Sequence, residues 1–128
     1  MLKYVIDSHS WIEYFIDTEK GRKLAKTIES SDNEVFTSVI SIAEICSIFK
    51  REGRDPLLAY KNIINLSTIH GISPEIARDA GIFHAEIRKR IKNFGMADCI
   101  ILLTARKLNA KILTGDPHFK GFKEAVMI

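Results

Sequence analysis

Four acidic residues of this chain lie where one kind of sequence pattern gives way to another. Asp7 follows a strand-like run, and Asp116 follows a second such run in a Gly-Asp-Pro turn. Glu44 and Asp98 each fall in the first turn of an apolar helical pattern. A carboxylate held beside apolar core is costly unless a cation compensates its charge. If the fold brings these four side chains together, their oxygen atoms would form a site of the kind that Mg²⁺ prefers.

Each carboxylate also has an ordinary structural explanation. Ser41 and Glu44 fit a capping box, in which the glutamate accepts a hydrogen bond from a backbone N–H. Asp98 would complement a helix dipole, and Asp116 would bond to the backbone of its own turn. Asp7 is the hardest to explain in this way, because an aspartate at the end of a strand has no routine structural role.

The segments that must position these acids alternate between strand-like and helix-like patterns, which predicts an α/β fold with a mainly parallel sheet. We expect strands at residues 2–6, 34–37, 66–69, 111–114 and 125–127. We expect helices from residue 10 onward and at 20–30, 41–52, 56–65, 74–92 and 97–108. The longest of these carries apolar residues at helical spacing from Ile76 to Ile91 and ends at Asn93-Phe94-Gly95.

In an open parallel sheet, ligands bind beyond the carboxyl ends of the strands, where the strand order reverses. Asp7 and Asp116 directly follow predicted strands, and the helices that carry Glu44 and Asp98 begin at the same edge. All four acids can therefore reach one crevice. Their convergence stays a prediction, because the sequence does not give the strand order.

Composition indicates a globular protein with a basic surface. The 128 residues are 46% hydrophobic and 27% charged, so we expect one domain over residues 1–128 with a core of its own. The net charge is +3, and it becomes +7 without the four acids, because 19 basic residues then face 12 acidic ones. Such a surface around an acidic crevice would suit a polyanionic substrate.

Neither a membrane span nor a secretory signal is apparent in the sequence, which favours a cytoplasmic protein. Cys46 and Cys99 stand among apolar neighbours without the spacing of a zinc site, so we expect two buried free thiols.

The runs around the four acids resemble the PIN-domain nucleases, and among them the VapC-type toxins of toxin–antitoxin pairs. The similar segments are Val5–Ser8, the helix of Glu44, Ala97–Ile101 and Ile112–Phe119, and the resemblance in order and spacing extends from Met1 to Phe122. It implies a three-layer α/β/α sandwich with an acidic pocket that binds Mg²⁺ or Mn²⁺ and cleaves RNA. His9 and His118 depart from the family pattern.

The resemblance assigns a role to particular residues. Asp7, Glu44, Asp98 and Asp116 would form the acidic set, with the hydroxyls of two further residues, Ser8 and Thr114, as supports. We therefore expect a metal-dependent endoribonuclease with Asp7 and Asp98 as principal ligands, in which Glu44 and Asp116 complete the pocket or orient water. The metal would lower the pKa of a bound water, and the products would carry 5′-phosphate and 3′-hydroxyl ends.

Candidates for contact with RNA are the basic run Arg88-Lys89-Arg90 and His118. The resemblance further implies a small VapB-type antitoxin that covers the acidic pocket, and a homodimer of the chain. An alternative is a PIN-like scaffold with silent acids that acts only through a partner protein. Metal-dependent cleavage of RNA by the isolated chain separates the two hypotheses.

Two other classes of aspartate enzyme fit poorly. A phosphatase of the haloacid-dehalogenase type needs a second aspartate two residues after the first, where this chain has His9. A receiver domain needs a lysine after a late strand, whereas Lys111 begins its strand.

Overall fold

Five parallel strands form one sheet at the centre of the computed structural model, which describes residues 2–128. Met1, the first residue of the expected resemblance, lies outside the described residues. Every pair of neighbouring strands is parallel, and the order across the sheet is β3-β2-β1-β4-β5. The strands are β1 (Leu2–Ile6), β2 (Asn33–Ser38), β3 (Thr68–His70), β4 (Lys111–Thr114) and β5 (Ala125–Met127).

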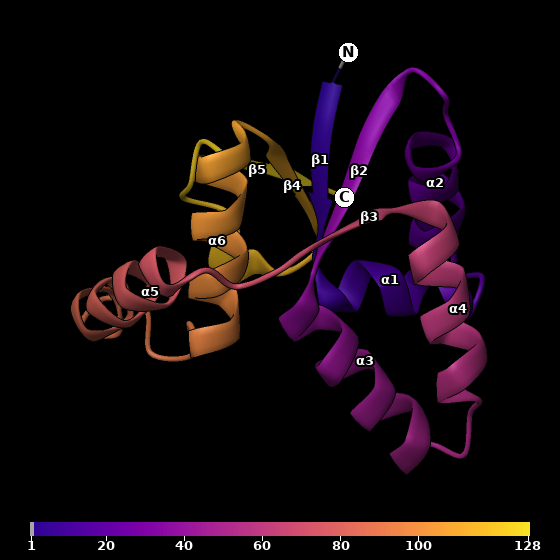
Figure 1. Cartoon of the computed structure of the whole chain (residues 1–128), viewed down its shortest axis with the longest axis horizontal. Helices are drawn as coiled ribbons and strands as arrows, with labels where there is room; N and C mark the ends of the chain where they lie inside the picture. Colours follow the sequence, from indigo (N-terminus) through magenta and orange to yellow (C-terminus); the bar gives the residue numbers. More distant parts are fainter. Residues whose placement is uncertain (1) are drawn as a thin grey trace.

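Helices cover both faces of the sheet, which confirms the predicted α/β sandwich with a parallel sheet. Figure 1 shows the first four helices gathered to one side of the central strands and the last two to the other. The first group comprises α1 (Ser8–Phe15), α2 (Glu19–Ile28), α3 (Val39–Arg51) and α4 (Pro56–Leu66). The second comprises α5 (Pro74–Ile87) and α6 (Met96–Leu108), and a short 3-10 helix, η1 (Pro117–Phe119), follows β4.

The central strands divide the core into two halves, because successive side chains of a strand point to opposite faces. Val5 and Ile112 pack with the buried residues of α5 and α6. Their neighbours Ile6 and Leu113 pack with the buried residues of α1 to α4. All four side chains are at most 4% exposed, so β1 and β4 are apolar on both faces, as expected for the centre of a parallel sheet.

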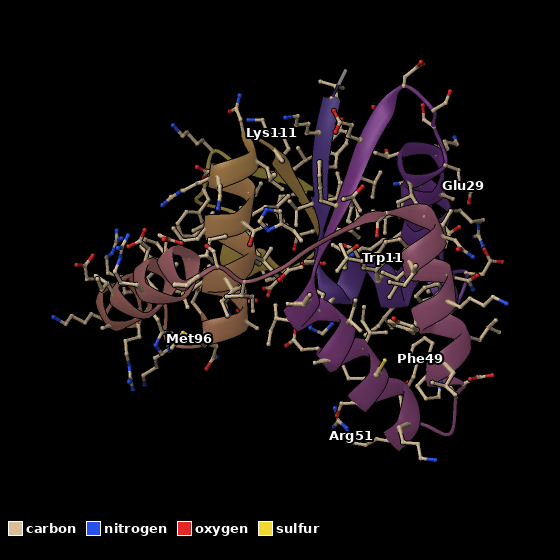
Figure 2. The ribbon with its side chains drawn as sticks, viewed as in Figure 1. Trp11, Glu29, Phe49, Arg51, Met96 and Lys111 are labelled. Atoms are coloured by element: carbon tan, nitrogen blue, oxygen red, sulfur yellow. The ribbon has the colours of Figure 1, made fainter. Side chains whose placement is uncertain are left out.

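Trp11 anchors the half of the core beneath α1 to α4. Its ring is fully buried, and its indole Nε1 donates to the hydroxyl of Thr37 on β2 over 3.0 Å. Trp11 and Phe49 both lie on this side of the sheet (Figure 2). Of the two expected buried thiols, Cys99 is buried and Cys46 is half-buried, and both are free.

Two predicted helix starts are wrong by two residues. α1 begins at Ser8 instead of Ser10, because the Asp7 side chain accepts from the backbone N–H of Ser10 and so caps the helix. α3 begins at Val39 instead of residue 41, because Ser38 is its N-cap.

The predicted helix over residues 74–92 is shorter than expected and ends at Ile87. Beyond it, Phe94 is 1% exposed and packs edge-on against Phe119. A helix that continued past Ile87 would carry Phe94 further along the helix axis. The helix ends at Ile87 instead, because the chain must turn there to bring Phe94 into the core. Ile91 packs against that core from the turn. Among residues 2–128, none of the helices combines the length and the apolar character that crossing a membrane requires.

A glycine at the corner between α1 and α2 permits their close approach. A Cβ atom on Gly21 would lie 2.0 Å from the carbonyl oxygen of Glu13, which is backbone and cannot rotate away. Gly81, in α5, has nothing within 4 Å of the same position.

We therefore predict that Gly21→Ala destabilises the chain by about 1–3 kcal/mol, the usual cost of overpacking, whereas Gly81→Ala stabilises it by about 0.5–1 kcal/mol. Urea unfolding followed by circular dichroism measures both. Equal stabilities for the two variants would contradict the close contact at the α1–α2 corner.

Candidate functional site

The strand order reverses between β1 and β4. The chain builds the sheet outward from β1 through β2 to β3, and then returns to the other side of β1 for β4 and β5. Ligands of open parallel sheets bind beyond the carboxyl ends of the strands at such a reversal. Asp7 directly follows β1, and Asp116 follows β4 after one intervening residue, so both acids lie at this position.

Glu44 and Asp98 reach the same edge from opposite sides of the sheet. α3 begins where β2 ends, and α6 begins at the edge where β1 and β4 end (Figure 1). Met96, at the start of α6, lies at the opposite end of that helix from Lys111, which starts β4 (Figure 2). The fold therefore brings acids from the sheet and from both helical layers to one edge.

Asp7 is the most enclosed of the four acids, with an exposed fraction of 3%. Its Oδ1 accepts from the backbone N–H of Ser10 over 2.8 Å, and its Oδ2 accepts from the hydroxyl of Thr114. Burial raises the pKa of Asp7, while the hydrogen bonds from Thr114 and Ser10 oppose that rise. Asp7, for which the sequence offered no routine structural role, does have one, because it is the N-cap of α1.

Asp98 shows that the four acids share one electrostatic environment. Burial is the main cause that raises the pKa of Asp98, and the negative charges of Asp116, Glu44 and Asp7 raise it further. The backbone N–H of Gly95, which donates to Asp98 Oδ2 over 2.9 Å, acts in the opposite direction. Asp98 is thus both a helix-terminal acid, as its structural explanation predicted, and a close neighbour of the other three.

Glu44 does not take part in the predicted capping box with Ser41. Because α3 begins at Val39, Glu44 lies in the second turn, and the cap is made by Ser38. The Glu44 carboxylate accepts instead from the hydroxyl of Ser8 over 2.6 Å. Ser8 of α1 therefore contacts an acid of the set that stands on α3.

Asp116 bonds to its own turn, as its structural explanation predicted. Its Oδ1 accepts from the backbone N–H of His118 over 2.9 Å and lies 3.0 Å from the ring Nδ1 of the same residue. The backbone N–H of Asp116 donates to the Thr114 hydroxyl over 3.0 Å. Thr114 therefore links Asp116 to Asp7.

The four acids suit a divalent cation in kind and in charge. Within residues 2–128, no lysine or arginine forms an ion pair with any of them. In the same part of the chain, no three acidic, histidine or cysteine side chains stand close enough together to hold an ion without rearrangement. The donor set is made of carboxylate oxygens, which Mg²⁺ and Mn²⁺ accept, and a cation would relieve the repulsion around Asp98.

The basic run that was predicted to contact RNA lies outside α5. Arg88 is the C-cap of that helix, and Lys89 and Arg90 are exposed residues of the segment that leads into α6. Asp98 stands in the first turn of α6, eight residues after Arg90 in the sequence (98 − 90 = 8).

A cavity that the sequence did not reveal adjoins Asp116. It has a volume of about 390 Å³ and is lined in part by Lys20, from the first turn of α2. No local pattern distinguishes Lys20 from the other exposed lysines of that helix.

Comparison with known proteins gives the family of the chain. Residues 4–125 match the family model of the PIN domain. The chain belongs to the PIN domain family. No curated protein matches the chain in sequence at a significant level.

Solved structures share the fold of this PIN domain at low sequence identity. A toxin–antitoxin complex from Klebsiella pneumoniae contains a chain that is 19% identical, with a TM-score of 0.75, covering 97% of this chain and 96% of that one. VapC20 of Mycobacterium tuberculosis, described as a toxin that cleaves the sarcin-ricin loop, is 16% identical, with a TM-score of 0.74 and coverage of 98% and 99%. A DNA-bound VapBC complex from Salmonella typhimurium contains a chain that is 17% identical, with a TM-score of 0.74, and the match covers 100% of this chain and 98% of that one. The expected similarity to VapC toxins is confirmed at the level of the fold.

The raised pKa of Asp98 predicts how the stability of this PIN domain depends on pH. A carboxyl whose pKa is higher in the folded chain adds stability below its unfolded pKa, near 3.8, and that contribution is lost as the pH rises through the folded value. At neutral pH the ionised carboxylate of Asp98 therefore destabilises the folded chain.

We predict that, in the presence of a chelator, Asp98→Asn stabilises the chain at neutral pH by about 0.5–1 kcal/mol, a modest value because solvent reaches Asp98. The gain should vanish as the pH falls to about 4. Asp55→Asn is the matched control, since Asp55 also accepts backbone N–H groups at a helix start but is exposed. If Asp98→Asn lowers the melting temperature at neutral pH while the control does not, the result would contradict a destabilising repulsion between Asp98 and the other three acids.

Proposed function

We propose that the chain is a metal-dependent endoribonuclease and the toxin of a type II toxin–antitoxin pair. The observation that carries this proposal is the gathering of four acids at the strand-order reversal: Asp7, Glu44, Asp98 and Asp116. The negative charges of the other three raise the pKa of Asp98, in addition to the effect of its burial. Membership of the PIN domain family supports nuclease chemistry, because the family is typically made of nucleases. The substrate would be RNA, and the ion would be Mg²⁺ or Mn²⁺.

The residues of the chain would hold the ion through carboxylate oxygens. Asp7 and Asp98 are the principal ligands that we propose, with Glu44 and Asp116 as further ligands or as acceptors for the attacking water. When bound, a divalent ion makes water a stronger nucleophile at neutral pH and neutralises charge on the phosphate.

The surrounding hydrogen bonds orient the acids. Thr114 and the Ser10 N–H fix the two oxygens of Asp7, and Ser8 fixes Glu44. Groups held in this way lose little conformational freedom when the substrate arrives, which is how supporting residues contribute to catalysis. Side-chain rotation of the less buried acids would complete the coordination.

Partners follow from the same proposal. We propose a VapB-type antitoxin as the cognate inhibitor, supported by the occurrence of chains with this fold in toxin–antitoxin complexes. We also propose a homodimer as the assembled form, which rests on the resemblance to the VapC-type toxins. Arg88, Lys89, Arg90 and His118 are the side chains proposed to contact RNA.

The alternative of a silent scaffold rests on a specific observation. Asp7, Asp98 and Asp116 each accept a backbone N–H at a helix start, so each already contributes to the fold. A scaffold that uses these acids only as caps would bind a partner without cleaving RNA. A cleavage assay with the purified chain decides between the two.

We predict that the purified chain cleaves single-stranded RNA when Mg²⁺ or Mn²⁺ is present, and that chelation stops it. Asp98→Asn should lower kcat by at least about 10²-fold, because an ion supplies several kcal/mol of charge stabilisation to the transition state. Asp55→Asn should cleave like the unaltered chain. End-labelled RNA and phosphatase sensitivity of the products measure both the rate and the expected 5′-phosphate. Undiminished cleavage by Asp98→Asn would rule out the assigned site.

We also predict that Mn²⁺ raises the melting temperature of the unaltered chain. An ion at about 100 times its dissociation constant stabilises the folded state by about 2.7 kcal/mol. Asp55→Asn should gain as much, and Asp98→Asn much less. A shift of equal size in all three proteins would place the ion elsewhere on the molecule.

A further inference from the structure

The cavity beside Asp116 lies between elements that are distant in the sequence. The start of α1 contributes His9, the start of α2 contributes Lys20, and the turn after β4 contributes Gly115, Asp116 and His118. Its volume of about 390 Å³ falls within the range of small-molecule sites, roughly 300–1,000 Å³, and would accommodate one nucleotide. Asp116 lines this cavity and also belongs to the acidic set.

Lys20 is the cationic group of this cavity, and its charge has no partner there. Its side chain forms no ion pair within residues 2–128, although Glu13 and Asp116 line the same cavity. The Glu13 carboxylate is engaged by the hydroxyl of Thr18 instead. The Lys20 ammonium is thus left available for an anion that enters from outside.

The ammonium lies over the backbone of the turn next to Asp116. A Cβ atom on Gly115 would stand 3.5 Å from Lys20 Nζ and 3.6 Å from Ile128 Cγ1, so the absence of a side chain at Gly115 keeps this part of the cavity open. The charge therefore sits one residue along the turn from a proposed metal ligand.

An anion held here would be adjacent to the bond being cleaved. Consecutive phosphates of a nucleic acid carry one negative charge per nucleotide, and lysine and arginine supply most of the sequence-independent affinity for them. The apolar side chains of Pro117 and Ile128 also line the cavity and provide a surface for a base.

We propose that this cavity is a subsite for one nucleotide of the RNA strand next to the scissile phosphate, and that Lys20 binds the phosphate of that nucleotide. The inference rests on the proposed nuclease function and extends it to a residue outside the acidic set. Lys20 is a positioning residue: it holds the strand and does not touch the reacting atoms.

The test compares Lys20→Gln with Lys23→Gln, an exposed lysine of the same helix that does not line the cavity. When each substitution is made in the otherwise unaltered chain and RNA cleavage is assayed, Lys20→Gln should raise KM by about 5–10-fold with kcat nearly unchanged. This is the effect expected from the loss of one charge-assisted contact. The slope of log KM against log salt should fall by about 0.7, the value for one phosphate of a single strand. Lys23→Gln should change neither quantity.

Binding is measured separately from cleavage. Both substitutions are combined with Asp98→Asn, and the affinity for a short fluorescent single-stranded RNA of mixed sequence is determined by anisotropy. A loss of about 5–10-fold confined to Lys20→Gln would support the subsite. Gly115→Leu, which fills the cavity beside the Lys20 ammonium, should weaken binding to a similar degree.

Each contrary result has a distinct meaning. Equal affinities of the Lys20→Gln and Lys23→Gln proteins for the RNA would overturn the subsite even if the chain is a nuclease. Displacement of the RNA by equal concentrations of nucleoside monophosphates would overturn it as well, since the cavity would then hold free nucleotides. Lys20-dependent binding without any cleavage by the unaltered chain would refute the nuclease and retain the RNA subsite.

Discussion

Asp7 places a carboxylate at the end of β1, between the two halves of the molecule, where only 3% of the residue is exposed. Its oxygens are held by the Ser10 N–H of α1 and the Thr114 hydroxyl at the end of β4. A buried carboxylate is tolerated only with such partners, so the turn into α1 and the pairing of β1 with β4 must both be in place. The group that we propose as a metal ligand therefore also ties together the two strands at the reversal.

Around this group the fold collects charges of the same sign. Glu44 comes from the layer of α1 to α4, and Asp98 comes from the layer of α5 and α6, so acids from both layers interact at this edge. The arrangement costs stability in the absence of a cation, which is common where a site needs strained or repelling groups for its function. Backbone N–H groups at helix starts offset part of that cost, because they donate to Asp7, Asp98 and Asp116.

Local pattern was enough for most of the architecture. The alternation of strand and helix and the buried face of α5 were both predicted from spacing, because each depends on neighbours within a few residues. The errors arose where two local signals competed. Ser41 and Glu44 matched a capping box, but Ser38, three residues before Ser41, is the N-cap of α3. The end of α5 was set by the burial of Phe94.

The sequence by itself determined which acids stand at the carboxyl ends of strands and at helix starts, because apolar periodicity and turn residues mark those boundaries locally. Only the tertiary structure decided that they share one edge. The contacts responsible join residues 36 and 107 positions apart, as between Ser8 and Glu44 and between Thr114 and Asp7. No local pattern encodes such pairs or the position of Lys20, because they depend on the strand order, which is fixed by packing over the whole chain.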